Sequence, residues 1–155
     1  MKNLITGLSL AVLCLVSSNI FSQDRVFAEP IEIKAGDTDA FTFVPPPANM
    51  PVNGMAANIT VTYTGFSTEA QTAFQHAVDI WESLLNTSRT ITINATWSPA
   101  SNPGNLGSAG ASSYWRNFSG APQSDTFWPQ PLAETLCDCD LGTDPDINAN
   151  FNSDR

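Results

Sequence analysis

The chain has 155 residues, a formal net charge of −9 at pH 7 and three cysteines. Its length fits a single domain with one main core. The acidic excess argues against nucleic acids and anionic membrane surfaces as partners, because their phosphates would be repelled. Neutral polymers, cationic polymers and metal ions are the partner classes that remain.

The amino terminus has the pattern of a secretory signal peptide. Lys2 precedes an apolar run over 4–16, and small residues follow over 17–22. The run is too short to span a membrane. We predict that residues 1–22 are removed, with cleavage after Ala28 as the alternative. The protein is then secreted, with the periplasm and the cell surface as alternatives to the extracellular space.

Residues 23–57 show little periodicity and include five prolines, three of them consecutive, at positions 45–47. This composition predicts an extended lead-in that carries no site. The apolar residues at 41, 43 and 44 favour one short edge strand, which Pro45 would end.

The stretch 68–86 has the pattern of an amphipathic helix. Its apolar residues recur at spacings of three and four, which gathers them on one face: Ala70, Ala73, Phe74, Ala77, Val78, Trp81, Leu84 and Leu85. Thr68 and Gln71 have the spacing of a capping box at the start of a helix. We therefore predict a helix that begins at Thr68 and ends near Asn86.

Residues 58–64 and 90–97 alternate apolar and polar side chains on either side of this helix, as half-buried strands do. Two strands joined by one helix make a β-α-β unit with parallel strands. The alternation indicates that the sheet face away from the helix is more polar. We expect an α+β fold with a small twisted mixed sheet, one long backing helix, long irregular loops and a carboxy-terminal edge strand over 146–153.

Residues 98–113 are rich in Gly, Ser, Asn and Pro, which predicts a loop. Five aromatic residues follow: Tyr114, Trp115, Phe118, Phe127 and Trp128. We favour a hydrophobic cluster packed beneath a long loop. The alternative is an exposed platform on which sugars stack. Residues 131–136 predict one helical turn.

Four aspartates form an acidic loop around Gly142: Asp138, Asp140, Asp144 and Asp146. Calcium prefers carboxylates on such a turn, although Gly142 is misplaced for an EF-hand. We weigh a calcium site against a solvated acidic loop and favour the loop.

The mature chain keeps Cys137 and Cys139, which only Asp138 separates. A disulfide across one residue is expected to be strained. Pairing between molecules, a partner cysteine elsewhere and free thiols are the alternatives. Two thiolates without a histidine or a further cysteine argue against a zinc site.

Recognisable catalytic constellations are missing from the sequence. His76 is its only histidine, and it lies on the polar side of the predicted helix, three residues before Asp79. One histidine provides no HExxH zinc helix and no convincing Ser-His-Asp set. Paired carboxylates for glycoside hydrolysis remain open, because no pair stands out.

The order of the segments at 59–99, 105–118 and 145–154 resembles the amino-terminal part of bacterial secreted zincin-like, metzincin-type metalloproteases. The resemblance covers roughly residues 58–154 and is most specific over the helix and its two strands. It implies a twisted sheet and, in the full-length relative, a zinc ion on a helix with the motif HExxHxxGxxH. It also implies that an edge strand aligns an extended peptide substrate by strand addition. That strand would be Ile147, Asn148, Ala149, Asn150 and Phe151.

The chain departs from this family because the zinc helix and its general-base glutamate are not in the sequence, which ends at Arg155. We expect residues 58–155 to be an incomplete amino-terminal subdomain of a larger protein. It would carry no catalytic residue and no zinc ligand, and would be inactive as it stands. The alternative function is a secreted non-catalytic module that binds carbohydrate or a surface through the five aromatic residues.

Overall fold

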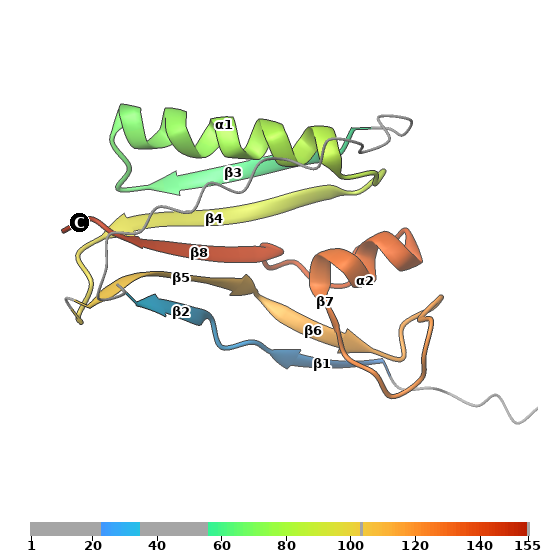
Figure 1. Ribbon diagram of the computed structural model, residues 1–155. Coiled ribbons are helices and arrows are strands. Elements are labelled where there is room, and N and C mark those ends of the chain that lie inside the picture. Colours follow the sequence, from blue (N-terminus) through green and yellow to red (C-terminus); the bar gives the residue numbers. More distant parts are fainter. Residues whose placement is uncertain (1–22, 35–55, 103, 155) are drawn as a thin grey trace, which may run out of the picture.

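The computed structural model describes residues 23–34, 56–102 and 104–154. The proposed signal peptide and the strand expected at 41–44 lie outside these residues. The described chain forms two helices and two sheets, which confirms the α+β class (Figure 1). The five-stranded main sheet has the order β2-β5-β8-β4-β3, and the three-stranded sheet has the order β1-β6-β7. The strands are β1 (Asp24–Phe27), β2 (Ile31–Lys34), β3 (Asn58–Thr64), β4 (Thr90–Ser98), β5 (Asn105–Ala111), β6 (Ser113–Arg116), β7 (Trp128–Pro129) and β8 (Ile147–Asn152), and the helices are α1 (Thr68–Leu84) and α2 (Gln130–Cys137).

The predicted β-α-β unit is confirmed. β3 and β4 pair in parallel over their whole common length, from Asn58 opposite Thr90 to Thr64 opposite Thr96. Both strands alternate β-branched or aromatic residues with Thr and Asn, a pattern suited to a pleated surface with two unlike faces. α1 connects them.

The start of α1 differs from the predicted capping box. The N-cap is Ser67, whose hydroxyl accepts a hydrogen bond from the backbone N–H of Ala70. Thr68 is the first helical residue instead, so its side chain is one position too late to cap. α1 ends at Leu84, because Leu85 already has an extended backbone.

The main sheet has one apolar and one polar face. Residues opposite one another in register share a face, and Tyr63 packs against Phe74 of α1, which identifies the face on the α1 side. On this side, rows such as Ile31-Ala109-Ala149-Ala95-Tyr63 and Ile33-Gly107-Phe151-Trp97 cross the sheet. On the other side the rows are Glu32-Ser108-Asn150-Thr96-Thr64 and Gly110-Asn148-Asn94-Thr62. The prediction of a more polar second face is confirmed.

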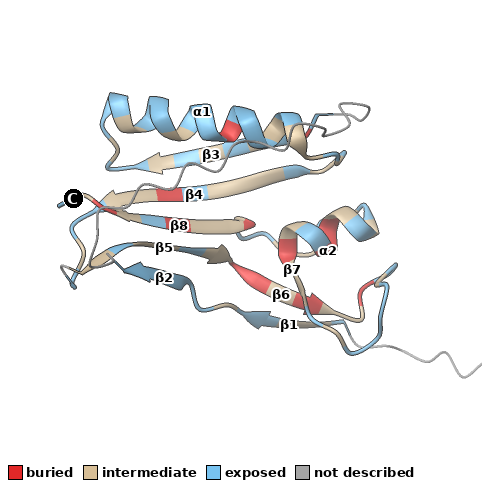
Figure 2. Cartoon of the chain, in the orientation of Figure 1, coloured by how far each residue is buried: buried red, intermediate tan, exposed pale blue. Residues whose placement is uncertain are grey.

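α1 covers the apolar face mainly beside β3, at one edge of the sheet (Figure 1). Val78 is the one residue of α1 that is buried. Trp81, expected on the packed stripe, is 56% exposed, and Ile31 at the far edge is 73% exposed. Figure 2 shows that most of α1 and β2 is exposed. Among the described residues, the apolar face is therefore only partly covered.

β8 is not the edge strand that its position in the sequence suggested. It lies in the middle of the main sheet, parallel to β4 on one side and antiparallel to β5 on the other. Alternation along 146–153 identified the strand correctly but carried no information about its neighbours.

The loop expected over 98–113 contains β5 and the first residue of β6. β5 consists mostly of small residues, and at Gly107 its backbone lies close to the backbone of β8. A Cβ atom on Gly107 would clash with the carbonyl oxygen of Asn150. At Gly107, therefore, the glycine that suggested a loop is required by the close approach of a neighbouring strand.

The lead-in is also more ordered than expected, because its first part forms β1 and β2. β1 pairs with β6 and β2 pairs with β5, both antiparallel. Asp24 accepts hydrogen bonds from the guanidinium of Arg116, which ties β1 to β6. β2 does alternate apolar and polar residues, but at four residues, Ile31–Lys34, it is too short to stand out in the sequence.

α2 is eight residues long, longer than the single turn that was predicted. It packs against β6 and β7, where Trp115, Phe118 and Ala133 form a small buried core. None of the described helices is long and apolar enough to cross a membrane.

Candidate functional site

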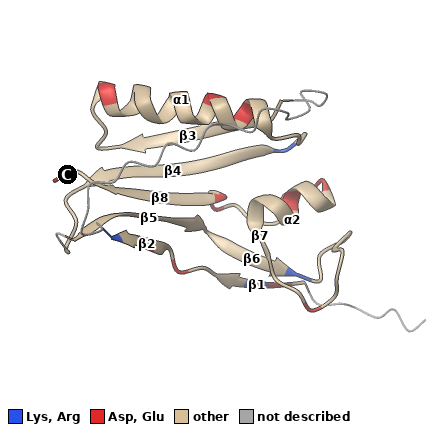
Figure 3. Ribbon diagram, viewed as in Figure 1, with Lys and Arg blue, Asp and Glu red and all other residues tan. Residues whose placement is uncertain are grey.

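The junction between α2, the main sheet and β6 holds a cluster of buried polar side chains. Gln130 is 1% exposed, Asp146 3%, Glu134 5%, and Ser113 is fully buried. Polar groups buried to this degree need hydrogen-bond partners, so their arrangement is specific. Acidic residues lie on both helices and at the start of β8 (Figure 3).

One chain of hydrogen bonds connects α2 to β6 and to the loop before β8. The hydroxyl of Ser113 donates to Oε1 of Gln130 at 2.7 Å and accepts from the indole N–H of Trp115 at 3.1 Å. Nε2 of Gln130 donates to the carbonyl oxygen of Asp144 at 3.1 Å. Gln130 therefore links the loop before β8 to the core beneath α2.

Asp146 joins the same loop to β4. Its Oδ2 accepts from the backbone N–H of Thr92 at 2.7 Å and from the Thr92 hydroxyl at 2.9 Å. The backbone N–H of Asp146 in turn donates to the Thr92 hydroxyl, and its carbonyl oxygen accepts from the N–H of Ser112. These bonds fix where β8 starts between β4 and β5.

Glu134 is the second acid of the junction. Its Oε1 accepts from the backbone N–H of Leu141 at 3.0 Å. Burial raises the pKa of Glu134; the negative charge of Asp146 and a hydrogen bond between the two carboxyl groups act in the same direction, against hydrogen bonds from the backbone of Leu141 and Gly142. Glu134 is therefore a carboxyl group biased towards its protonated form.

A polar cavity of about 410 Å³ opens beside these two acids. Its walls come from the residues before and in β4, from α2 and from the loop before β8. Those that bear on the chemistry are Arg89, Thr92, Gln130, Glu134, Asp140 and Asp146. The cavity thus has an acidic, hydrogen-bonding interior.

The four aspartates that we considered as calcium ligands do not gather around one point. Asp138 accepts from the hydroxyl of Ser88, Asp140 forms an ion pair with Arg89, and Asp144 forms one with Arg25. Asp146 turns inward to Thr92, as described above. Solvated or ion-paired carboxylates fit the loop better than a shared calcium ion.

Cys137 and Cys139 form a disulfide, with their Cα atoms 5.2 Å apart. The expectation that one intervening residue disfavours a bridge was wrong. Asp138 has φ 51° and ψ 42°, a left-handed conformation that ends α2 and brings the flanking residues within the usual range for a disulfide. The disulfide thus links the last residue of α2 to the residue after its C-cap.

The predicted substrate-aligning strand cannot act as such. The backbone of β8, from Ile147 to Phe151, is paired with β4 and β5, so no edge is left for a peptide. Its polar side chains instead bond to the neighbouring strand: Asn148 donates to the hydroxyl of Ser112, and Asn150 to that of Ser108.

The aromatic residues after position 113 pack rather than form an open platform. Trp115 is 9% exposed and Phe118 is 4% exposed, and Trp128 packs against them. Phe127 lies beneath the guanidinium of Arg116, 5.0 Å from the ring centroid. The favoured prediction of a packed cluster is confirmed for Trp115, Phe118 and Trp128, whereas Phe127 is 38% exposed.

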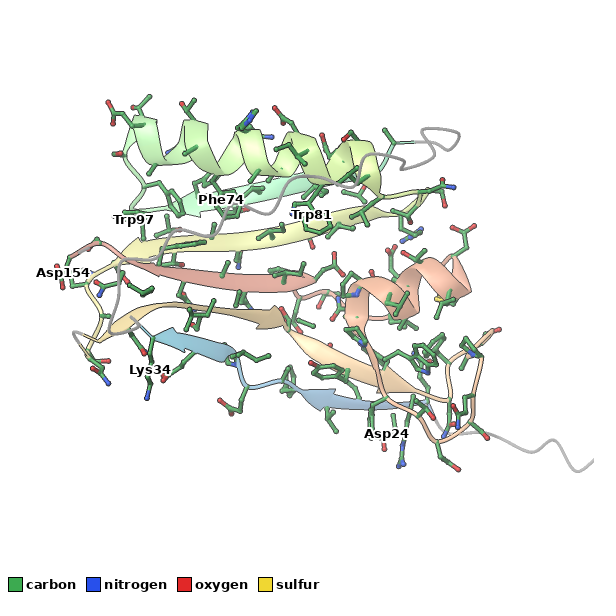
Figure 4. The ribbon with its side chains drawn as sticks, in the orientation of Figure 1. Asp24, Lys34, Phe74, Trp81, Trp97 and Asp154 are labelled. Carbon is green, nitrogen blue, oxygen red and sulfur yellow. A yellow bond between two sulfur atoms is a disulfide. The ribbon has the colours of Figure 1, made fainter. Side chains whose placement is uncertain are left out.

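A second aromatic group, not recognised in the sequence, lies beneath the start of α1. Its members, Tyr63, Phe66, Phe74, Trp97 and Phe151, come from β3, the turn before α1, α1, β4 and β8, and each is only half-buried. Trp97 and Phe151 stack with their planes 19° apart. Phe74 and Trp97 face the space between α1 and the sheet in Figure 4.

His76 lies on the exposed side of α1, as predicted. It lines a shallow pocket with Tyr63, Gln75 and Asp79, in which Tyr63 donates to Gln75 and Gln75 donates to Asp79. Burial, followed by the charge of Asp79, raises the pKa of Tyr63. Nothing in this pocket activates a nucleophile.

The described residues do not supply a zinc site. No group of three or more His, Cys, Asp or Glu side chains suited to a metal ion occurs within 23–34, 56–102 and 104–154. The zinc of the proposed relatives therefore has no ligand set in this part of the chain.

Sequence reasoning missed Glu134 and Gln130 as members of a site. Their spacing of four puts both on one face of α2, beside the buried Ala133. Polar residues on the apolar side of a short helix were the available signal. The partners Asp146 and Thr92 could be found only from the fold.

Comparisons of this chain with protein-family models, with curated proteins and with solved structures gave no match.

Proposed function

We propose that this chain is the amino-terminal subdomain of a secreted metallopeptidase of the zincin type and that it hydrolyses no peptide by itself. One observation carries the proposal: the apolar face of the main sheet extends over five strands, whereas α1 covers it mainly beside β3. An apolar sheet face of this extent needs a second layer. In the proposed protein, the zinc-bearing helix and its surroundings supply that layer.

The half-buried aromatic group beneath α1 supports the same role. Its rings come from three strands, a turn and a helix, and they lie at the end of the sheet where β4 and β8 finish. Partly exposed aromatic rings contribute strongly to contacts between protein surfaces. They give the second layer a place to anchor.

The experiment recovers the polypeptide from the medium of its natural host, with an affinity tag inserted at the gene's own locus after the signal peptide. We expect a polypeptide longer than this chain, with one zinc ion per molecule by elemental analysis and a proteolytic activity that chelators abolish. A zinc-free polypeptide that ends at Arg155 and cleaves no casein would refute the proposal.

A matched pair of variants tests the apolar face directly. Ala109 is exposed on this face, and Thr62 is exposed on the polar face. Ala109→Asp should place a charge between the layers and reduce the zinc content and activity of the recovered protein, because a buried unpaired charge is costly. Thr62→Asp should leave both unchanged. Equal effects of the two variants would argue against a second layer on this face.

The polar face favours a second candidate, a module that binds neutral carbohydrate. Thr60, Thr62, Asn94 and Asn150 are exposed there, and hydroxyl and amide groups can both donate to and accept from sugar hydroxyls. This replaces the five aromatic residues, of which Trp115 and Phe118 are buried. Retention of the chain on immobilised glycans, and its loss in Asn94→Ala, would support this candidate over the first.

A further inference from the structure

Glu134 and Asp146 form a buried pair of carboxyl groups from distant parts of the chain. Both residues line the same polar cavity, and they are 5% and 3% exposed. Oδ2 of Asp146 is occupied by Thr92. Oδ1 is buried and has no hydrogen-bond donor among the described residues, unless the carboxyl group of Glu134 donates to it.

No cation neutralises this pair in the described structure. The charged groups around it are Arg89, which precedes β4, and Asp140 and Asp144 on the loop between α2 and β8. Arg89 is committed to Asp140, and Arg25 of β1 is committed to Asp144. Two adjacent carboxylates buried without a cation would be strongly unfavourable, so such pairs retain one proton between them.

We propose that Glu134 and Asp146 share one proton, and that this proton holds α2 against the main sheet and makes their junction sensitive to pH. Glu134 donates to Oδ1 of Asp146, while its other oxygen accepts from Leu141. Asp146 keeps its bonds to Thr92. Loss of the proton leaves two buried negative charges in contact, with α2 on one side and β4 and β8 on the other.

The direction of the pH effect follows from proton linkage. The folded chain holds the proton at pH values where an unfolded glutamate, with a pKa of about 4.3, has lost it. The folded state therefore binds more protons than the unfolded state within this window. The free energy of unfolding is highest below this pH window and falls as the pH rises through the pKa of the Glu134 carboxyl group in the pair.

Thermal unfolding from pH 4.5 to 8.5 in EDTA tests the proposal on the wild-type chain, Glu134→Gln and the control Asp125→Asn. The amide that Glu134→Gln introduces does not titrate, and it can still donate a hydrogen bond to Asp146. We expect the melting temperature of the wild type to fall with pH relative to that of Glu134→Gln by about 5 °C. Asp125 is exposed and does not line the cavity that Glu134 and Asp146 share, so Asp125→Asn should follow the wild type.

Parallel pH profiles for the wild type and Glu134→Gln would overturn the proposal. If the variant does not fold, carbon-13 NMR of the side-chain carboxyl groups follows the pair in the wild-type chain. The carboxyl group of Glu134 should then titrate above the ordinary range of a glutamate. Titration of Glu134 at or below that range would equally overturn the proposal.

Discussion

The main sheet and the α2 region bury different kinds of residue. The main sheet and α1 bury mostly small side chains, Ala95, Ala149 and Val78, and leave much of an apolar face exposed. The α2 region buries Trp115 and Phe118 together with Gln130, Glu134 and Ser113. The longer secondary structure thus lies in the less buried region. In this chain, therefore, neither the length of an element nor its amphipathic pattern indicates where the best-packed core lies.

The sharpest test of this difference compares two tryptophans. Trp115→Ala removes a buried ring and its bond to Ser113, so we expect a loss of about 3 to 4 kcal/mol of unfolding free energy. Trp81→Ala, at a 56% exposed position of α1, should cost less than about 1 kcal/mol. Urea denaturation followed by circular dichroism measures both. Equal losses would mean that α1 is packed as tightly as the α2 region.

A second test concerns how tightly the middle of the main sheet is built. Gly107→Ala places a Cβ atom against the backbone of β8, which has to shift, and should cost about 2 kcal/mol. Gly110→Ala is the matched control on the same strand, because its Cβ would have ordinary contacts, the nearest at 3.6 Å from Pro30. The control should change stability little. A neutral Gly107→Ala would show that β5 and β8 are not in close register.

The smallest expected effect distinguishes the observed cap of α1 from the predicted one. Ser67→Ala removes the hydroxyl that accepts from Ala70 and should cost about 1 kcal/mol. Thr68→Ala, at the position that the sequence favoured, should cost less, because alanine suits the first turn of a helix. The same denaturation assay ranks them. A reversed ranking would restore Thr68 as the cap.

Local patterns in the sequence predicted local structure well. Alternation over 58–64 and 90–97 and the spacing within 68–86 predicted β3, β4 and α1, since these periods follow from backbone geometry alone. They could not predict that β8 lies between β4 and β5, because strand order depends on pairing between segments far apart in sequence. β5 was missed because its Gly, Ser and Ala residues are typical of loops, and the close approach to β8 that requires Gly107 is visible only in the fold.

The candidate site was less accessible to prediction. The acidic loop drew attention to Asp146 for its spacing from other aspartates, whereas in the fold Asp146 bonds to Thr92 of β4 and lines one cavity with Glu134 of α2. The disulfide was misjudged because the left-handed backbone of Asp138 is a single local conformation that spacing does not reveal. Both cases depend on where the chain turns, which residue types alone specify weakly.

The central place of β8 has a consequence for the order of folding. β8 follows every other described strand in the sequence. Nevertheless β4, which also pairs with β3, and β5, which also pairs with β2, both have β8 as their second hydrogen-bonded neighbour. While the chain is being synthesised from its amino end, β3, α1 and β4 can associate early, but the sheet has a gap until residues 147–152 arrive. Pairings of this long range form slowly and leave strand edges open meanwhile. A chaperone that holds the incomplete sheet would therefore act on β4 and β5.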